Sequence, residues 1–252
     1  MDADRKVAVA VGTLFITATA TSILGTGLSR PLLSDADRLT RLTANPTQVT
    51  GGALLELIAA GACAGLAIAL YPVSSKWHAG LALGSVVFRS IEAVMYAVAA
   101  ASLLSLLSLG HQFTSAGAAD RAALQAAGDS LMGLREQATL VGVLGFSLGA
   151  LLYYWIFFRS RLIPRWLSAW GLVAIILLIA TWLLALFTQT SMLSYVILAL
   201  PIAVQEMVLA VWLLARGFSA PAQLGSVQPL ARDEDAVRGH ALAHELPQEA
   251  AV

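Results

Sequence analysis

Two charged side chains inside an apolar stretch are the residues best placed to do chemistry. Residues 81–109 form an apolar run that includes Arg89 and Glu92, and crossing a bilayer takes about 20 helical residues. A charge near the middle of the hydrocarbon costs at least about 2.5 kcal/mol on insertion scales. Residues three apart share one face of a helix and can partly neutralise each other. Because Tyr96 follows Glu92 by four positions, we expect Arg89, Glu92 and Tyr96 to face the inside of a helix bundle.

This charged face has two interpretations, and the residues alone favour neither. Arg89 and Glu92 can form an ion pair that locks two helices together and fixes how they pack. The same groups can hold a ligand or a proton, which is the common role of ionisable residues inside a membrane.

The composition is typical of a polytopic membrane protein. The chain has 252 residues, of which 58% are hydrophobic and 12% charged, whereas a soluble domain has about 25% charged residues. The mean hydropathy is +0.78. A net charge of zero gives no support for nucleic acid as a partner. The single cysteine, Cys63, cannot form an intramolecular disulfide.

The fold class is all-α, a bundle of six transmembrane helices in a domain of residues 1–218. We expect these helices at about residues 7–28, 49–71, 81–109, 138–158, 167–188 and 192–215. Residues 219–252 are polar and are predicted to be a disordered cytoplasmic tail. The tail holds His240 and His244, which we expect to be solvated, so neither a metal nor another cofactor is predicted.

The connections between the expected helices carry two further predictions. Pro72 should end the second helix, and residues 35–42 could form a short surface helix capped by Ser34. Residues 111–137 form the largest loop, which is rich in alanine. We expect part of it to lie on the membrane as an amphipathic helix and part of it to extend the fourth helix.

The orientation follows from a cluster of aromatic and basic residues at the end of the fourth helix. An aromatic belt of residues 153–158 precedes Arg159, Arg161 and Arg165, which lie in one short loop. Short loops rich in lysine and arginine stay in the cytoplasm. Six helices then place both termini on that side.

Depth along the helices predicts two layers of polar residues. At about 1.5 Å per residue, Arg89 and Glu92 lie roughly 12 and 16 Å from Leu81, and Glu206 lies roughly 15 Å from Arg216. The central layer consists of Arg89, Glu92, Tyr96, Gln205 and Glu206. The outer layer consists of Glu56, Arg135 and Glu136. In the central layer two carboxyl groups, Glu92 and Glu206, face the one guanidinium of Arg89. If one of these carboxyl groups carries a proton, the layer is better explained as a ligand or proton site than as an ion pair that only holds helices together.

Five separated motifs resemble those of a bacterial integral membrane family. They are residues 45–56, 70–73, 88–94, 158–168 and 201–207, which include Asn45-Pro46, Tyr71-Pro72, Phe88-Arg89, Pro164-Arg165-Trp166 and Gln205-Glu206. The family is the domain of unknown function 4386, and the likeness runs from the first helix to about Phe218. It implies a compact multi-pass protein of the bacterial cytoplasmic (inner) membrane. It supplies no activity and no catalytic residue.

Three functions fit these observations. We expect first a protein that binds or transports a small molecule or a lipid, because Pro201 lies next to Gln205 and Glu206 in the central layer, although no inverted repeat is visible. The alternative is a non-catalytic scaffold or partner subunit whose charges are packing locks. An intramembrane enzyme using Glu92 and Glu206 is less favoured, because no hydrolase or metalloprotease motif is present. The expected partners are membrane lipids, a small-molecule or lipid ligand, and a protein partner or a second copy of the chain.

Overall fold

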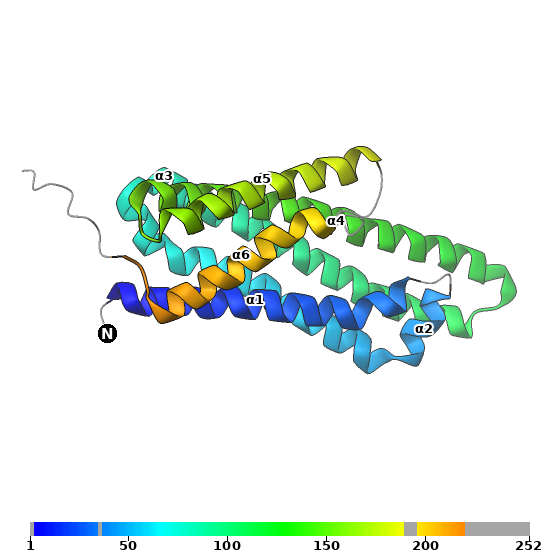
Figure 1. Ribbon diagram of the computed structural model, residues 1–252. Helices are drawn as coiled ribbons and strands as arrows, with labels where there is room; N and C mark the ends of the chain where they lie inside the picture. Colours follow the sequence, from blue (N-terminus) through cyan, green and yellow to red (C-terminus); the bar gives the residue numbers. More distant parts are fainter. Residues whose placement is uncertain (1–2, 35–36, 189–195, 220–252) are drawn as a thin grey trace, which may run out of the picture. The chain divides into compact units, whose positions relative to one another are not determined.

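Every secondary-structure element in the part of the chain that the structure describes is an α-helix. The computed structural model describes residues 3–34, 37–188 and 196–219. The helices are α1 (Ala3–Leu33), α2 (Arg38–Ala44), α3 (Pro46–Ser115), α4 (Ala118–Ser160), α5 (Arg165–Thr188) and α6 (Val196–Ala215) (Figure 1). Of these, all but α2 are long and apolar enough to cross a membrane. The predictions for residues 192–195 and for the tail after Ser219 lie outside the described residues.

Helix α3 folds back on itself at His78. The backbone there has φ −158° and ψ 93°, which is not helical. A straight helix of 70 residues would be about 105 Å long. Yet the Arg135 guanidinium contacts both Glu56 and the carbonyl of Ala99, which would lie about 65 Å apart on a straight helix. The first arm of α3 (residues 46–77) and the second arm (residues 79–115) therefore run back along each other (Figure 1).

Three predicted connections differ from the structure. Pro72 does not end a helix, because the first arm continues past it to the turn at His78. Residues 111–137 are not a loop, since α3 extends to Ser115 and α4 begins at Ala118, and the prediction that part of this segment extends the fourth helix is confirmed. Alanine is the strongest helix former, so the alanine-rich composition of this segment favours helix. The short surface helix α2 starts later than predicted, and Ser34 donates to the carbonyl of Pro31 (3.3 Å) instead of capping it.

Two apolar cores hold the helices together. The larger core joins α1, α3, α4, α5 and α6 around Phe15, Tyr153, Tyr154 and Phe157, which are buried. The smaller core packs α2 against both arms of α3 and is made of Leu32, Leu39, Leu42, Val49, Ala53, Leu103 and Leu106. The smaller core lies where α3 and α4 continue beyond α5 and α6 (Figure 1). It therefore supports the part of the bundle that α5 and α6 do not cover.

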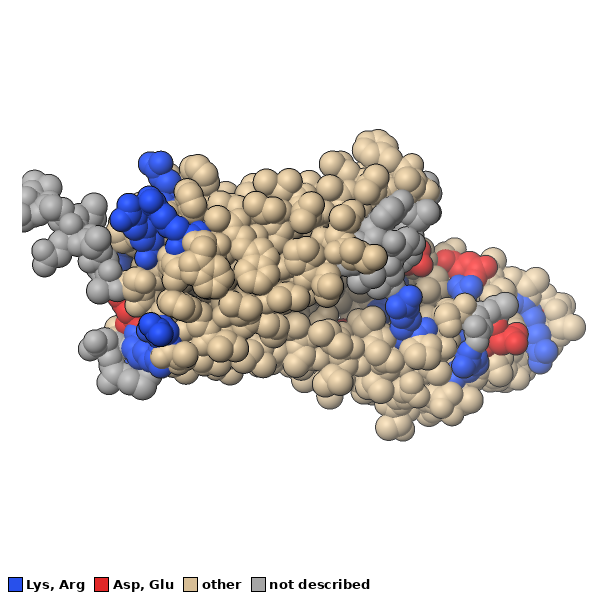
Figure 2. Space-filling view, viewed as in Figure 1, with Lys and Arg blue, Asp and Glu red and all other residues tan. Residues whose placement is uncertain are grey.

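The helix ends around the turn of α3 are tied together, and we call this region the His78 end. Arg5 of α1 donates to the carbonyls of Leu213 (3.1 Å) and Leu214 (2.6 Å) at the end of α6. Lys76 forms an ion pair with Asp4 (3.0 Å). Lysines and arginines gather at this end, and Figure 2 shows a broad band without charged residues between it and the opposite end. The uncharged band is what a membrane-spanning surface requires.

Candidate functional site

The charges in the second arm of α3 form a buried ion pair, as their spacing predicts. Arg89 Nη1 lies 2.9 Å from Glu92 Oε2, and the side chains are only 2% and 3% exposed. The Arg89 guanidinium also stacks over the ring of Phe146, 4.8 Å from its centroid. Both charges are therefore removed from lipid and from water.

A row of glycines on α4 closes the bundle around this pair. A Cβ atom on Gly149 would lie 2.9 Å from Cγ of Arg89, and one on Gly145 would lie 3.0 Å from the carbonyl oxygen of Phe88. Only a residue without a side chain allows α4 to approach the second arm this closely. Cys63, from the first arm, is also buried and lies close enough to Glu92 and Arg89 to interact with both electrostatically. Arg89 and Glu92 lie on the same arm of α3, so what joins the helices here is the packing of Arg89 against Gly149 and Phe146 of α4.

Gln205 and Glu206 on α6 bind tyrosines rather than Arg89. The Tyr154 hydroxyl donates to Gln205 Oε1, and Gln205 Nε2 donates to the carbonyl of Leu167 (3.1 Å). The Tyr153 hydroxyl donates to Glu206 Oε1 at 3.4 Å. No residue in the described part of the chain forms an ion pair with Glu206. Glu206 therefore makes no direct ion pair with Arg89, although it lies close enough to Arg89 and Glu92 to interact with both electrostatically.

The sequence does not predict the tyrosine partners, because Tyr153 and Tyr154 fit the pattern of an aromatic belt. Both are fully buried, and their rings pack 4.5 Å apart. In contrast, Trp155, one residue further along α4, is exposed, as a belt residue should be. Successive helical residues point about 100° apart, so an unbroken aromatic run must contribute to both the core and the surface.

The outer polar residues Glu56 and Arg135 meet in a two-pronged ion pair. Arg135 Nη1 and Nη2 donate to the two carboxylate oxygens of Glu56 at 2.9 and 2.5 Å. Arg135 also donates to the carbonyl of Ala99 (2.6 Å), and Ser29 donates to Glu56 (3.2 Å). These contacts join α1, both arms of α3 and α4 at one point.

Glu136, the third residue predicted for the outer layer, does not take part. Its side chain is exposed, and it makes no hydrogen bond or ion pair within the described residues. It follows Arg135 directly on α4, so it points about 100° away from the direction in which Arg135 reaches the bundle.

A cavity of about 120 Å³ lies beside the Glu56–Arg135 pair, and we call it the outer cavity. It is lined by Ser22, Thr26, Glu56, Ala59, Tyr96, Ala99, Arg135 and Thr139. Tyr96 thus faces this cavity as well as packing its ring on Gly142. The hydroxyls of Ser22, Thr26 and Tyr96 form no hydrogen bond with any described residue, so they are free to bind a guest. The volume accommodates about four water molecules at roughly 30 Å³ each.

The two ion pairs lie at different depths. Counted along the helices from the His78 end, Arg89 is about 16 Å away, Glu56 about 33 Å and Arg135 about 37 Å. With the His78 end at one surface of a hydrocarbon core about 30 Å thick, the first pair would fall near the middle of the core and the second at its far boundary. In the described part of the chain, no group of three or more potential metal-binding side chains is present.

Long apolar helices with buried, paired charges define an integral membrane protein with several membrane-spanning helices. The chain belongs to the family described as Domain of unknown function (DUF4386), which matches residues 10–217. This confirms the resemblance noted from the five motifs. No curated protein and no solved structure matches the chain.

Proposed function

We propose that the chain crosses the bacterial cytoplasmic membrane six times, with each arm of α3 forming a separate pass. The arms are about 48 and 55 Å long, and α5 is about 36 Å long, so each is long enough to span about 30 Å of hydrocarbon. The start of α1 and the end of α6 lie at the His78 end, so both termini are then on that side of the membrane. That end faces the cytoplasm because it carries Arg5, Lys6, Lys76, Arg159, Arg161, Arg165 and Arg216.

Reporter fusions test this topology. Alkaline phosphatase, which is active only after export, should be active when fused after Ala116 and inactive when fused after Arg216. A fluorescent protein that folds in the cytoplasm should show the reverse pattern. If both positions behave alike, the number of passes between them is even and the proposed topology is wrong.

The outer cavity supports binding of a small polar solute as the protein's function. It combines a carboxylate, a guanidinium and three free hydroxyls at the boundary where a helix bundle meets water. Glu56 and Arg135 already bond each other, so a guest carrying both hydrogen-bond donors and acceptors would pair chiefly with the three free hydroxyls beside them. A few well-placed polar groups are what fix a ligand's orientation. The main support for this proposal is that both members of the Glu56–Arg135 pair line the cavity.

Binding is favoured over passage across the membrane by the packing beneath the cavity. The Arg89–Glu92 pair and the glycines of α4 lie between the cavity and the His78 end. A solute in the outer cavity would have to separate these helices to go further. Transport would therefore require a second arrangement of α3 and α4.

Filling the outer cavity tests the binding function. Thr26→Trp places an indole at the exposed mouth of the cavity, whereas Ile23→Trp places it on the neighbouring surface of α1, where the side chain is 65% exposed. Protein purified in mild detergent is denatured, and the released small molecules are identified by mass spectrometry. We expect a compound that is present with the wild type and with Ile23→Trp and is depleted with Thr26→Trp. Equal amounts of every compound in all three samples would contradict the proposal.

A non-catalytic scaffold or partner subunit is the second candidate, supported by the closed packing around Arg89 and Glu92. In that case the Glu56–Arg135 pair serves only to hold α3 and α4 in register, and the Arg89–Glu92 pair only neutralises two buried charges within one arm of α3. Thr26→Trp would then release the same compounds as the wild type, while another protein of the same membrane would co-purify with the chain in stoichiometric amount.

A further inference from the structure

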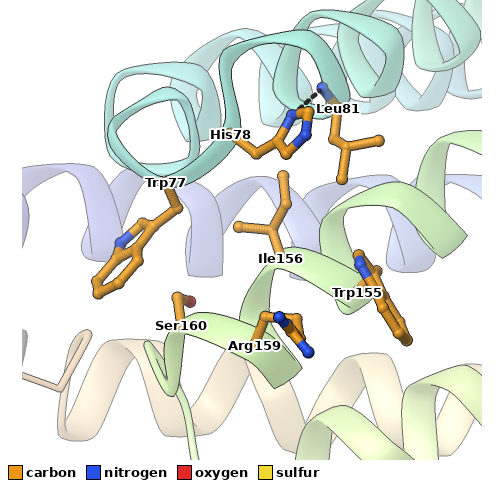
Figure 3. A pocket seen from close by; sticks show the side chains of 7 residues that line it. All are labelled: Trp77, His78, Leu81, Trp155, Ile156, Arg159 and Ser160. Carbon is orange, nitrogen blue, oxygen red and sulfur yellow. Dashed lines mark hydrogen bonds between the residues drawn. The ribbon is translucent and has the colours of Figure 1, made fainter.

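A larger cavity lies at the His78 end, away from the Arg89–Glu92 and Glu56–Arg135 pairs. It measures about 460 Å³ and lies between the turn of α3 and the end of α4. Its lining, drawn in Figure 3, consists of Trp77, His78, Leu81, Trp155, Ile156, Arg159 and Ser160. We call it the His78 cavity. It has no part in the binding function proposed above.

The polar groups of the His78 cavity are those that bind an anion. His78 Nδ1 accepts a hydrogen bond from the backbone N–H of Leu81 (3.2 Å), as Figure 3 shows. In the neutral imidazole, the other ring nitrogen must then carry the proton and is a donor. The Arg159 guanidinium makes no hydrogen bond or ion pair with any described residue. No carboxylate of the described residues lines the cavity, and Asp4 at the same end is already paired with Lys76.

The other walls of the His78 cavity are apolar and aromatic. Trp77 and Trp155 stand on either side in Figure 3, with Ile156 between them. Tryptophan prefers the boundary between lipid headgroups and acyl chains. On the second arm, Leu83 and Val87 are about half exposed and extend an apolar surface toward the middle of the membrane. A soluble anion would leave these surfaces unused, whereas a lipid would cover them.

We propose that the His78 cavity binds the phosphate of an anionic glycerophospholipid. His78 and Arg159 donate to the phosphate oxygens, and guanidinium groups match phosphate in geometry as well as in charge. Trp77 and Trp155 enclose the glycerol and the first carbons of the acyl chains. The bound lipid bridges the turn of α3 and the end of α4, so it fixes the position of the first arm relative to α4.

Three variants separate this site from general attraction to acidic lipids. Arg159→Gln removes the free charge. His78→Asn keeps an oxygen that can accept from the Leu81 N–H but lacks the donor that faces the cavity. Arg161→Gln is the matched control, because Arg161 lies two residues further on, at the C-cap of α4, and does not line the cavity.

Lipid binding is measured on the purified full-length protein by native mass spectrometry. Phosphatidylglycerol and phosphatidylcholine with identical acyl chains are added in turn, and inorganic phosphate is added as a competitor. We expect phosphatidylglycerol to bind the wild type at least about tenfold more tightly than phosphatidylcholine. Removing one charge-assisted hydrogen bond should weaken that binding by about tenfold in Arg159→Gln and in His78→Asn, and Arg161→Gln should match the wild type.

Three results would overturn the proposal. Equal weakening by Arg159→Gln and Arg161→Gln would show that only the overall charge of the loop matters. Equal binding of the two lipids would show that the site does not select an anion. Displacement of phosphatidylglycerol by inorganic phosphate at comparable concentration would show that the cavity takes a soluble phosphate and not a lipid.

Discussion

Replacing both members of the buried Arg89–Glu92 pair should destabilise the protein far less than replacing one. Arg89→Met leaves the Glu92 carboxylate about 3% exposed and without its partner, and Glu92→Leu leaves the guanidinium 2% exposed. Breaking a buried ion pair from one side costs about 3–5 kcal/mol. For a chain of this size that corresponds to a fall of about 6–20 °C in Tm, at roughly 2–4 °C per kcal/mol.

The geometry of the pair explains why the double variant should recover. Beyond the single 2.9 Å contact, Nε of Arg89 has no hydrogen-bond partner, so the desolvated charges are only partly compensated. Replacing a buried ion pair by apolar residues of similar size is often neutral and can stabilise a protein by about 1–4 kcal/mol. Against this, the double variant no longer has the stacking of Arg89 on Phe146, an interaction that contributes about 0.5–2 kcal/mol. We therefore expect the double variant within about 1 kcal/mol of the wild type.

The assay is thermal unfolding of the purified protein in detergent, followed by intrinsic fluorescence. Val94→Leu, on the lipid-facing side of the same arm, is the control and should melt like the wild type. The coupling between the two sites should exceed by far the roughly 0.5 kcal/mol scatter of independent sites. If the double variant is destabilised as much as the two single variants together, each charge acts through a different partner and the Arg89–Glu92 pairing is refuted.

Three further changes test the packing and the outer site by the same assay. Gly145→Ala should lower the free energy of unfolding by about 1–3 kcal/mol, because the new Cβ would meet the backbone of α3 at 3.0 Å. The control Gly133→Ala has open space around it and should be neutral or stabilise the protein by up to about 1 kcal/mol. Equal effects of the two variants would contradict the close approach of α4. Gln205→Leu should cost about 1–3 kcal/mol because the buried Tyr154 hydroxyl is left without its acceptor, and an unchanged Tm would show that this hydrogen bond is dispensable. Glu56→Gln should cost about 1.5–3 kcal/mol because it weakens the charge-assisted hydrogen bonds to Arg135, and stability equal to that of the wild type would show that the outer ion pair does not hold the helices together.

The sequence predicts the features that depend only on residues close together in the chain. An apolar run of about 20 residues has few alternatives to a membrane helix, and a three-residue spacing is enough to place Arg89 and Glu92 together. The level of Glu56 and Arg135 follows from counting residues along two helices. The alanine-rich segment 118–137 also carries a local signal, its helix propensity, which outweighs the polarity that favours a loop.

The remaining features depend on which helices touch, and this is not a local property. Glu206 has two potential partners at its depth, and the packing of α6 against α4 and α3 determines that it bonds Tyr153 and forms no direct ion pair with Arg89. The His78 cavity arises because a turn in one chain segment faces the end of another. His78 is exposed, and its ring also caps the second arm of α3 through the N–H of Leu81, a role that its position in the sequence does not reveal.

We propose that the layer around Arg89 and Glu92 is closed while the outer cavity is open to a solute. The native Cys63 reports on the first part because it is buried beside the Arg89–Glu92 layer and is the only cysteine in the chain. Thr26→Cys reports on the outer cavity, which Thr26 lines. A charged thiol reagent that cannot cross membranes is added to the outer face, and the rates of labelling are compared. We expect rapid labelling of Thr26→Cys and no labelling of the wild type, and the claim would be contradicted by labelling of Cys63 at a similar rate or by an unreactive Thr26→Cys.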